Sequence, residues 1–168
     1  NIDEIKVPRW LGCFKHDQKE LHIFCDASEL VYCCVAYLKV YSRGEYVSRL
    51  VCAKARVAPM KSETISRLEL LACTLGVRLA RAVNLVFKVD PIKTHYWTDS
   101  RNALCWIHSA PSKLKVYVQN RVGEIRRSTE IAQWHHVPTD ENPADVATRF
   151  ITSEELKAND LWWKGPEF

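Results

Sequence analysis

Two acidic residues stand where a carboxylate could do chemistry, because each interrupts or follows an apolar segment. Asp26 lies inside residues 21–28 (LHIFCDAS), where a buried charge is costly unless it is paired or binds a cation. Asp99 directly follows residues 92–98 (IKTHYWT), and an acid at such a junction serves either as a helix cap or as a metal ligand. Together they raise the question of a shared cation site.

Glu69 and Asp145 are two further acids, and ordinary structural roles are also open to them. Glu69 lies about 80° from the centre of the apolar stripe of residues 62–87, on the shoulder of a helix, where a solvated glutamate is common. Asp145 is the third residue of a helix that begins at Pro143 with Asn142 as N-cap, and an acid there complements the helix dipole. Neither residue alone predicts a site.

The elements that must position these acids follow from apolar periodicity and turn residues. We predict strands over residues 21–28, 30–41, 46–57, 92–98 and 131–138. We predict helices over residues 62–87, with Ser62 and Thr64 as available caps, over 100–108 and 113–127, and from Pro143 within residues 141–150. Three antiparallel strands followed by αβ crossovers predict an α/β fold, with a mixed five-stranded sheet and helices packed on it.

The four acids meet at one edge of this sheet if its first and fourth strands are neighbours. Four carboxylates in one place repel each other strongly without a cation. Mg²⁺ is the natural cation for oxygen ligands, and two such ions about 4 Å apart catalyse phosphodiester cleavage.

Four segments in the right order resemble the ribonuclease H domain of reverse-transcribing elements: FCDAS, RLELLA, YWTDS and HHVPTDENPADVATR. Longer segments, VAPMKSETISRLELLA, NRVGEI, ENPADVATR and LWWKGP, resemble the BEL/Pao type of LTR retrotransposon. The resemblance implies a ribonuclease H-like fold with helices on both faces of the sheet, and an endoribonuclease that cleaves the RNA strand of RNA–DNA hybrids.

The resemblance also implies a role for each acid. Asp26 would bridge two Mg²⁺ ions, for which Mn²⁺ substitutes. Asp145 would complete the nucleophile-side site, and Glu69 and Asp99 would hold the leaving-group-side ion. An activated water would attack the scissile phosphate and leave a 3′-hydroxyl and a 5′-phosphate.

The chain departs from many ribonucleases H in one place. They carry a catalytic histidine on a loop before the last helix, whereas residues 138–143 (PTDENP) contain none. His135 and His136 precede this loop as possible auxiliary residues, although a structural histidine in a strand is the alternative.

Basic residues are concentrated in two zones, residues 49–67 and 112–128, of a chain with a net charge of +4. Such zones favour a polyanion partner, and a solvated surface is the alternative. The expected substrate-binding residues are Ser28, Arg67, Asn102, Lys113, Lys115, Arg121, Arg126 and Arg127.

Composition bounds the remaining expectations for the 168 residues. We find no apolar run long enough for a membrane span and no signal segment, and seven cysteines without a CxxC motif suit free buried thiols. We expect residues 1–20 to be a lead from an upstream reverse transcriptase, 21–150 the ribonuclease H domain, and 151–168 a tail or linker toward integrase. The partners implied are the polymerase domain and integrase of one polyprotein, and no membrane is implied. The isolated domain is expected to be a monomer. The expected location is the cytoplasm, in a virus-like particle.

Three other functions are alternatives to this one. A catalytically silent ribonuclease H-like scaffold would suit degenerate acids, but all four are present. A transposase or integrase core places its catalytic glutamate on a late helix, whereas the late acid here is Asp145. A zinc-binding interaction domain would need closely paired cysteine ligands.

Overall fold

One mixed five-stranded sheet forms the centre of the computed structural model, which describes residues 5–7, 11, 13, 17–42, 44–60 and 63–168. The strands are β1 (Gln18–Ala27), β2 (Val31–Ser42), β3 (Glu45–Val57), β4 (Thr94–Thr98) and β5 (Trp134–His136). Their order across the sheet is β3-β2-β1-β4-β5. β1, β2 and β3 pair antiparallel, and β4 and β5 continue the sheet in parallel with β1. The predicted mixed five-stranded sheet is confirmed, and its first and fourth strands are neighbours, which was the condition for the acids to meet.

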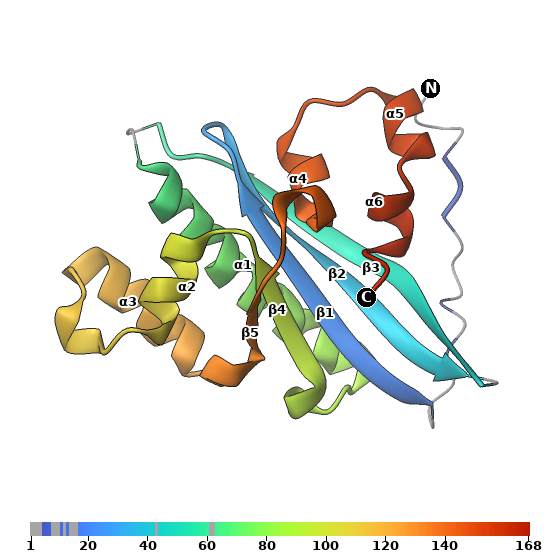
Figure 1. Cartoon of the computed structure of the whole chain (residues 1–168), viewed down its shortest axis with the longest axis horizontal. Coiled ribbons are helices and arrows are strands. Elements are labelled where there is room, and N and C mark those ends of the chain that lie inside the picture. Colours follow the sequence, from blue (N-terminus) through green and yellow to red (C-terminus); the bar gives the residue numbers. More distant parts are fainter. Residues whose placement is uncertain (1–4, 8–10, 12, 14–16, 43, 61–62) are drawn as a thin grey trace.

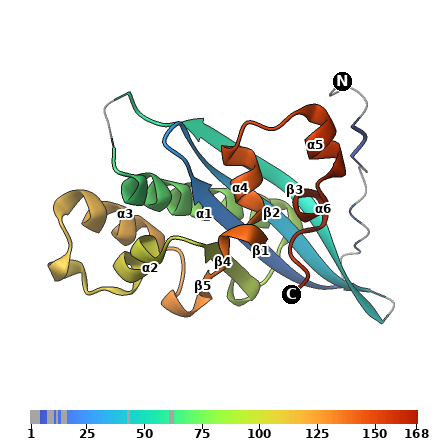
Figure 2. The same ribbon diagram turned by 45° about the horizontal axis from the view of Figure 1, so that its top comes forward.

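Helices cover both faces of the sheet (Figure 1). α1 (Ile65–Phe87), α2 (Arg101–His108) and α3 (Val116–Arg126) pack on one face, and α4 (Pro143–Thr148) packs on the other. The view of Figure 2 shows α1 and α4 on opposite sides of β1 and β2. β1 can pack on both sides because its residues alternate, with Ile23 and Cys25 toward α1 and Phe24 and Asp26 toward α4.

α1 is the central helix of the larger core. Its one glycine, Gly76, allows a close approach to β1, because a Cβ there would lie 2.6 Å from the Cys25 Sγ. Thr64 is the N-cap residue without a side-chain cap bond, and the other predicted cap, Ser62, lies outside the described residues. Among the described residues, α1 alone is long and apolar enough to cross a membrane by length and composition, but more than half of that window is buried. This burial is typical of a core helix.

Short 3₁₀ turns shorten several predicted elements. The strand predicted over residues 131–138 forms only at Trp134–His136, because Ile131–Gln133 makes a 3₁₀ turn closed by a capping box between Glu130 and Gln133.

Prolines shift two other starts. The fourth strand and the helix predicted over residues 113–127 start later than predicted, because 3₁₀ turns that begin at Pro91 and Pro111 occupy their first residues. The last helix begins at Pro143 with Asn142 as its N-cap, as predicted, and ends at Thr148, two residues before the end of the predicted segment. β1 differs in the other direction, since its pairing with β2 already begins at Gln18.

Residues 151–168 fold back onto the α4 face of the sheet. They form α5 (Ser153–Ala158) and α6 (Asp160–Lys164), drawn in red beside β3 in Figure 1. The Tyr37 hydroxyl donates a 2.6 Å hydrogen bond to the Trp162 carbonyl, and the Phe168 ring lies 5.0 Å from the Trp97 ring. The proposed division of the chain at residues 20 and 150 remains a prediction.

Candidate active site

Asp26 and Asp99 lie side by side at one end of the sheet. β1 and β4 run parallel with Cys25 opposite Thr98, so the next residue of each chain segment is an aspartate at the carboxyl end of its strand. The first turn of α2 does not use Asp99 as its cap, because the Ser100 hydroxyl accepts the hydrogen bond from the Ala103 amide. Asp99 is therefore available as a ligand.

Glu69 reaches the same point from the other face of the sheet. It lies in the second turn of α1, and only 8% of its surface is exposed. One ligand oxygen each from Asp26, Glu69 and Asp99 lie within 4.8 Å of one another. The helix-shoulder position expected for Glu69 thus faces the sheet edge rather than solvent.

Burial and mutual repulsion raise the pKa of two of these acids. Burial, opposed by a hydrogen bond from Thr148 and assisted by the charges of Asp99 and Asp145, raises the pKa of Asp26 to about 6. Burial and the nearby charges of Asp26 and Asp99 raise the pKa of Glu69 to about 9. These are the shifts expected when carboxylates converge without a compensating positive charge.

Asp145 lies beside this group of three rather than within it. Its carboxylate forms a 2.8 Å ion pair with Arg149, one turn later on α4. Its charge nevertheless contributes to the raised pKa of Asp26, so the two groups are close enough to interact. The predicted N-cap of this helix is confirmed, with the Asn142 side chain accepting a hydrogen bond from the Ala144 amide.

The group of three fits a hard divalent cation. Among the described residues, Glu69 Oε2 and Asp99 Oδ1 are buried oxygens without a hydrogen-bond partner. Such oxygens are costly to bury unless an ion or water satisfies them, and carboxylate oxygens are the ligands that Mg²⁺ prefers.

Hydroxyl and amide groups around the acids were not predicted from the sequence. The Thr148 hydroxyl donates to Asp26 Oδ2, and the Thr139 hydroxyl donates a 2.7 Å bond to Asp99 Oδ2. The Asn142 amide donates to the Cys25 carbonyl, which joins α4 to β1. The signal for Thr148 was present, since it lies one helical turn after Asp145 on a helix that must face the site.

The two histidines, His135 and His136, lie in β5, and their auxiliary role stays a prediction. The His135 ring packs against Trp97 at 4.7 Å and against His95 at 5.5 Å. His136 is exposed at the last residue of the strand, paired in register with Thr98.

The expected substrate-binding residues differ in their surroundings. Ser28 accepts hydrogen bonds from the amides of the β1–β2 turn, and Asn102 donates to the Ser66 hydroxyl across α1 and α2. Arg67 pairs with Glu63 at 2.9 Å and lies over the Tyr117 ring, which Arg121 also covers.

The remaining four basic residues lie on or beside α3. Arg126 donates to the Ile107 and Ser109 carbonyls, so it anchors α3 to the end of α2. Lys113, Lys115 and Arg127 are exposed.

Comparison with known proteins gives one family match. The model described as "Pao retrotransposon-like RNaseH-like domain" matches residues 1–100. No curated protein matches the chain. The family description agrees with the resemblance drawn from the motifs and with the predicted ribonuclease H-like fold.

Solved structures of ribonucleases H are similar at low identity. LC11-RNase H1, solved in complex with an RNA/DNA hybrid, is 8% identical with a TM-score of 0.48 over 74% of this chain and 88% of that one. The N-terminal ribonuclease H domain of a Mycobacterium tuberculosis protein, fused to maltose-binding protein, is 12% identical with a TM-score of 0.45 over 74% and 86%. RNase H1 of Halobacterium salinarum is 11% identical with a TM-score of 0.42 over 73% and 86%.

Proposed function

The chain belongs to the Pao retrotransposon-like RNaseH-like domain family, and on this premise we propose that it is a ribonuclease H that hydrolyses the RNA strand of RNA–DNA hybrids. One observation carries the proposal. Three carboxylates from β1, α1 and the end of β4 converge within 4.8 Å, and two of their buried oxygens lack a partner among the described residues. A metal-dependent reaction explains why a fold would retain this costly arrangement.

The four acids together would hold two Mg²⁺ ions, or two Mn²⁺ ions in their place. Asp26 is beside Asp99 and near enough to Asp145 for the two charges to interact, so it would contribute to holding both ions. Glu69 and Asp99 supply the two unpartnered oxygens. When bound, the ions supply the positive charge that activates water and stabilises the attacked phosphate.

The surrounding residues orient these ligands and contact the substrate. The Thr148 and Thr139 hydroxyls each hold one oxygen of Asp26 or Asp99, which orients the second oxygen of each carboxylate. The exposed Lys113, Lys115 and Arg127 beside α2 and α3 are suited to phosphate contacts. The RNA 2′-hydroxyl and the hybrid's shape would distinguish the substrate from DNA duplexes.

The cellular setting that we propose follows from the family. The domain would work in a polyprotein beside the reverse transcriptase polymerase domain and integrase, in a cytoplasmic virus-like particle. The isolated domain would be monomeric.

Cleavage of three matched duplexes tests the proposed substrate. An end-labelled RNA–DNA hybrid, an RNA–RNA duplex and a DNA–DNA duplex of one sequence are incubated with the protein and Mg²⁺ or Mn²⁺. The proposal expects cuts in the RNA strand of the hybrid alone. Binding of the hybrid without cleavage in either metal would contradict it and favour the silent binding module.

A further inference from the structure

A second group of metal-binding side chains lies on the same face of the sheet, away from the four acids. Glu20, His22 and His95 each offer a ligand atom, and these atoms lie within 4.8 Å of one another. Even numbers of positions separate Glu20, His22 and Asp26 on β1, so their side chains lie on the same face of the sheet. His95 is the β4 partner of His22. His22 is four residues before Asp26, a strand distance of roughly 13 Å.

The spacing within this group suits four-coordinate binding. His22 Nε2 lies 3.4 Å from Glu20 Oε2. Two ligand atoms about 2.0–2.1 Å from a tetrahedral zinc ion are about 3.3–3.4 Å apart. The pair is therefore already separated by the edge of such a tetrahedron.

The His22 imidazole is suited to be a neutral ligand, and the surroundings of His95 suit a ligating tautomer. Burial, assisted by the neighbouring His95, lowers the pKa of His22 to about 4, so its ring is uncharged at neutral pH. His95 Nδ1 lies 3.3 Å from His135 Nε2. When His95 donates this hydrogen bond, its Nε2 lone pair is free for a metal, with His135 as the outer partner that ligating histidines usually have.

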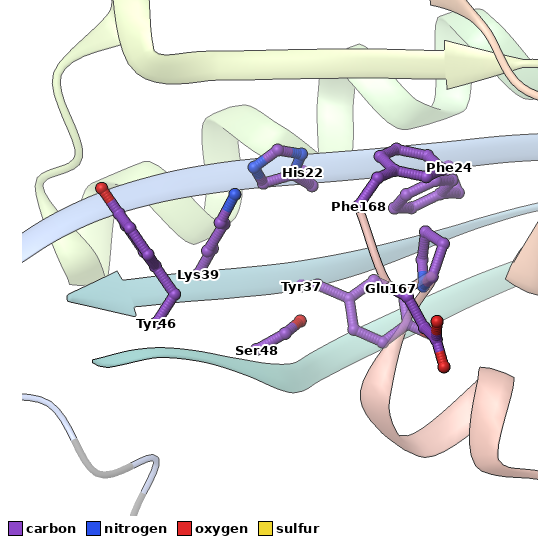
Figure 3. A pocket seen from close by; sticks show the side chains of 9 residues that line it. His22, Phe24, Tyr37, Lys39, Tyr46, Ser48, Glu167 and Phe168 are labelled. Atoms are coloured by element: carbon purple, nitrogen blue, oxygen red, sulfur yellow. The ribbon is translucent and has the colours of Figure 1, made fainter. Parts of the chain in front are cut away.

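A pocket gives access to His22, one of the three residues. A cavity of about 260 Å³ is lined by His22, Lys39 and Phe168 among others. Figure 3 shows His22 on β1 and Lys39 on β2 projecting toward the same open side of the sheet. Lys39 Nζ lies 3.9 Å from Glu20 Oε2, so a bound cation would compete with this ammonium for the carboxylate.

We propose that Glu20, His22 and His95 form a binding site for one transition-metal ion of the zinc type, independent of the four-acid site. Two imidazoles and one carboxylate select Zn²⁺ or Co²⁺ over Mg²⁺, which prefers oxygen ligands. A bound ion would join β1 to β4 upstream of Asp26 and Asp99.

Trp97 competes with a metal ion for His22, because its hydrogen bond fixes the tautomer of the His22 ring. The Trp97 indole donates a 3.2 Å hydrogen bond to His22 Nδ1, so neutral His22 carries its proton on Nε2. Binding through Nε2 moves this proton to Nδ1 and breaks the Trp97 bond, with no net proton released. Trp97→Phe should therefore tighten zinc binding about two- to tenfold, the change that corresponds to one neutral hydrogen bond.

Calorimetric titration with ZnCl₂ tests the site in a full chain that carries Asp26→Asn and Asp99→Asn, which removes binding at the acids. One equivalent of Zn²⁺ should still bind. Adding His95→Gln should weaken this binding at least about tenfold, whereas adding His108→Gln, a change of an exposed histidine on α2, should not. Glu20→Gln, at a carboxylate that is 35% exposed, replaces His95→Gln if that variant does not fold.

Two results would overturn the proposal. No zinc binding by the Asp26→Asn, Asp99→Asn chain would mean that the ions bind only at the four acids. Unchanged affinity after His95→Gln or Glu20→Gln would mean that the zinc ligands lie elsewhere.

Discussion

Glu69 is the residue whose burial conflicts most with its charge. Its pKa of about 9 lies above the ordinary value of 4.5, so the folded chain binds more protons than the unfolded chain between these values. Since the unfolding free energy falls with pH wherever the folded state holds more protons, this group destabilises the metal-free protein as pH rises from about 5 to 9.

Glu69→Gln removes this pH-dependent cost. We predict that it stabilises the metal-free protein by about 1–3 kcal/mol at pH 8 and by much less at pH 5, because glutamine has no charge to desolvate. Urea unfolding of both proteins at the two pH values, in EDTA, measures the difference. An equal gain at both pH values would show that packing, not ionisation, separates them.

Thr148 is predicted to act through Asp26 rather than on the substrate. Thr148→Val keeps the shape of the side chain and loses the hydroxyl that donates to Asp26 Oδ2. Hybrid cleavage at saturating protein should fall about ten- to a hundredfold, as for outer partners of metal ligands, while hybrid affinity stays the same. Thr148→Ser, which keeps the hydroxyl, should restore most of the rate, and failure of this rescue would contradict the role.

At the scale of elements, α3 offers two adjacent arginines with opposite expected roles. Arg126 hydrogen-bonds to two carbonyls at the end of α2, whereas Arg127 is exposed. Arg126→Ala should lower the unfolding free energy by about 1–3 kcal/mol. Arg127→Ala should leave stability within about 0.5 kcal/mol and weaken hybrid binding. Thermal unfolding and a binding titration on both variants check this, and equal destabilisation would contradict it.

The mixed sheet, and the position of Asp26 and Asp99 at strand ends, were predictable because they follow from long, strongly patterned elements. The three strands of the antiparallel meander and α1 carry clear periodicity, and neighbouring first and fourth strands place Asp26 beside Asp99. The length of β5 was overestimated. Residues 131–138 look like one strand from their composition, but the first three form a 3₁₀ turn.

Contacts between distant segments could not be predicted from local pattern. The bonds from Thr139 to Asp99 and from Thr148 to Asp26 depend on how the chain enters and leaves α4. The packing of Trp162 and Phe168 on the sheet depends on the path of residues 151–168. Arg126 resembled its exposed neighbour in sequence, and only the position of the Ile107 carbonyl separates them.

At the scale of the whole molecule, charge distribution predicts how hybrid binding responds to salt. Residues 112–128 hold five basic residues and one acid, whereas residues 139–168 are acidic overall. Each phosphate contact adds about −0.7 to −0.9 to the slope of log affinity against log salt. Arg127→Ala should therefore make the slope shallower by about one, measured by titrations between low and physiological salt. An unchanged slope would place the hybrid away from α3.

The role of the carboxylates in cleavage is tested most directly by single-turnover cleavage of the hybrid in Mg²⁺, measured for the unchanged chain and for Asp99→Asn. The substitution keeps the side-chain size and removes one ligand charge beside Asp26. We predict cleavage of the RNA strand by the unchanged chain, a rate at least about a thousandfold lower for Asp99→Asn, and equal hybrid affinity. Cleavage by Asp99→Asn at the unchanged rate would contradict a reaction carried by these carboxylates.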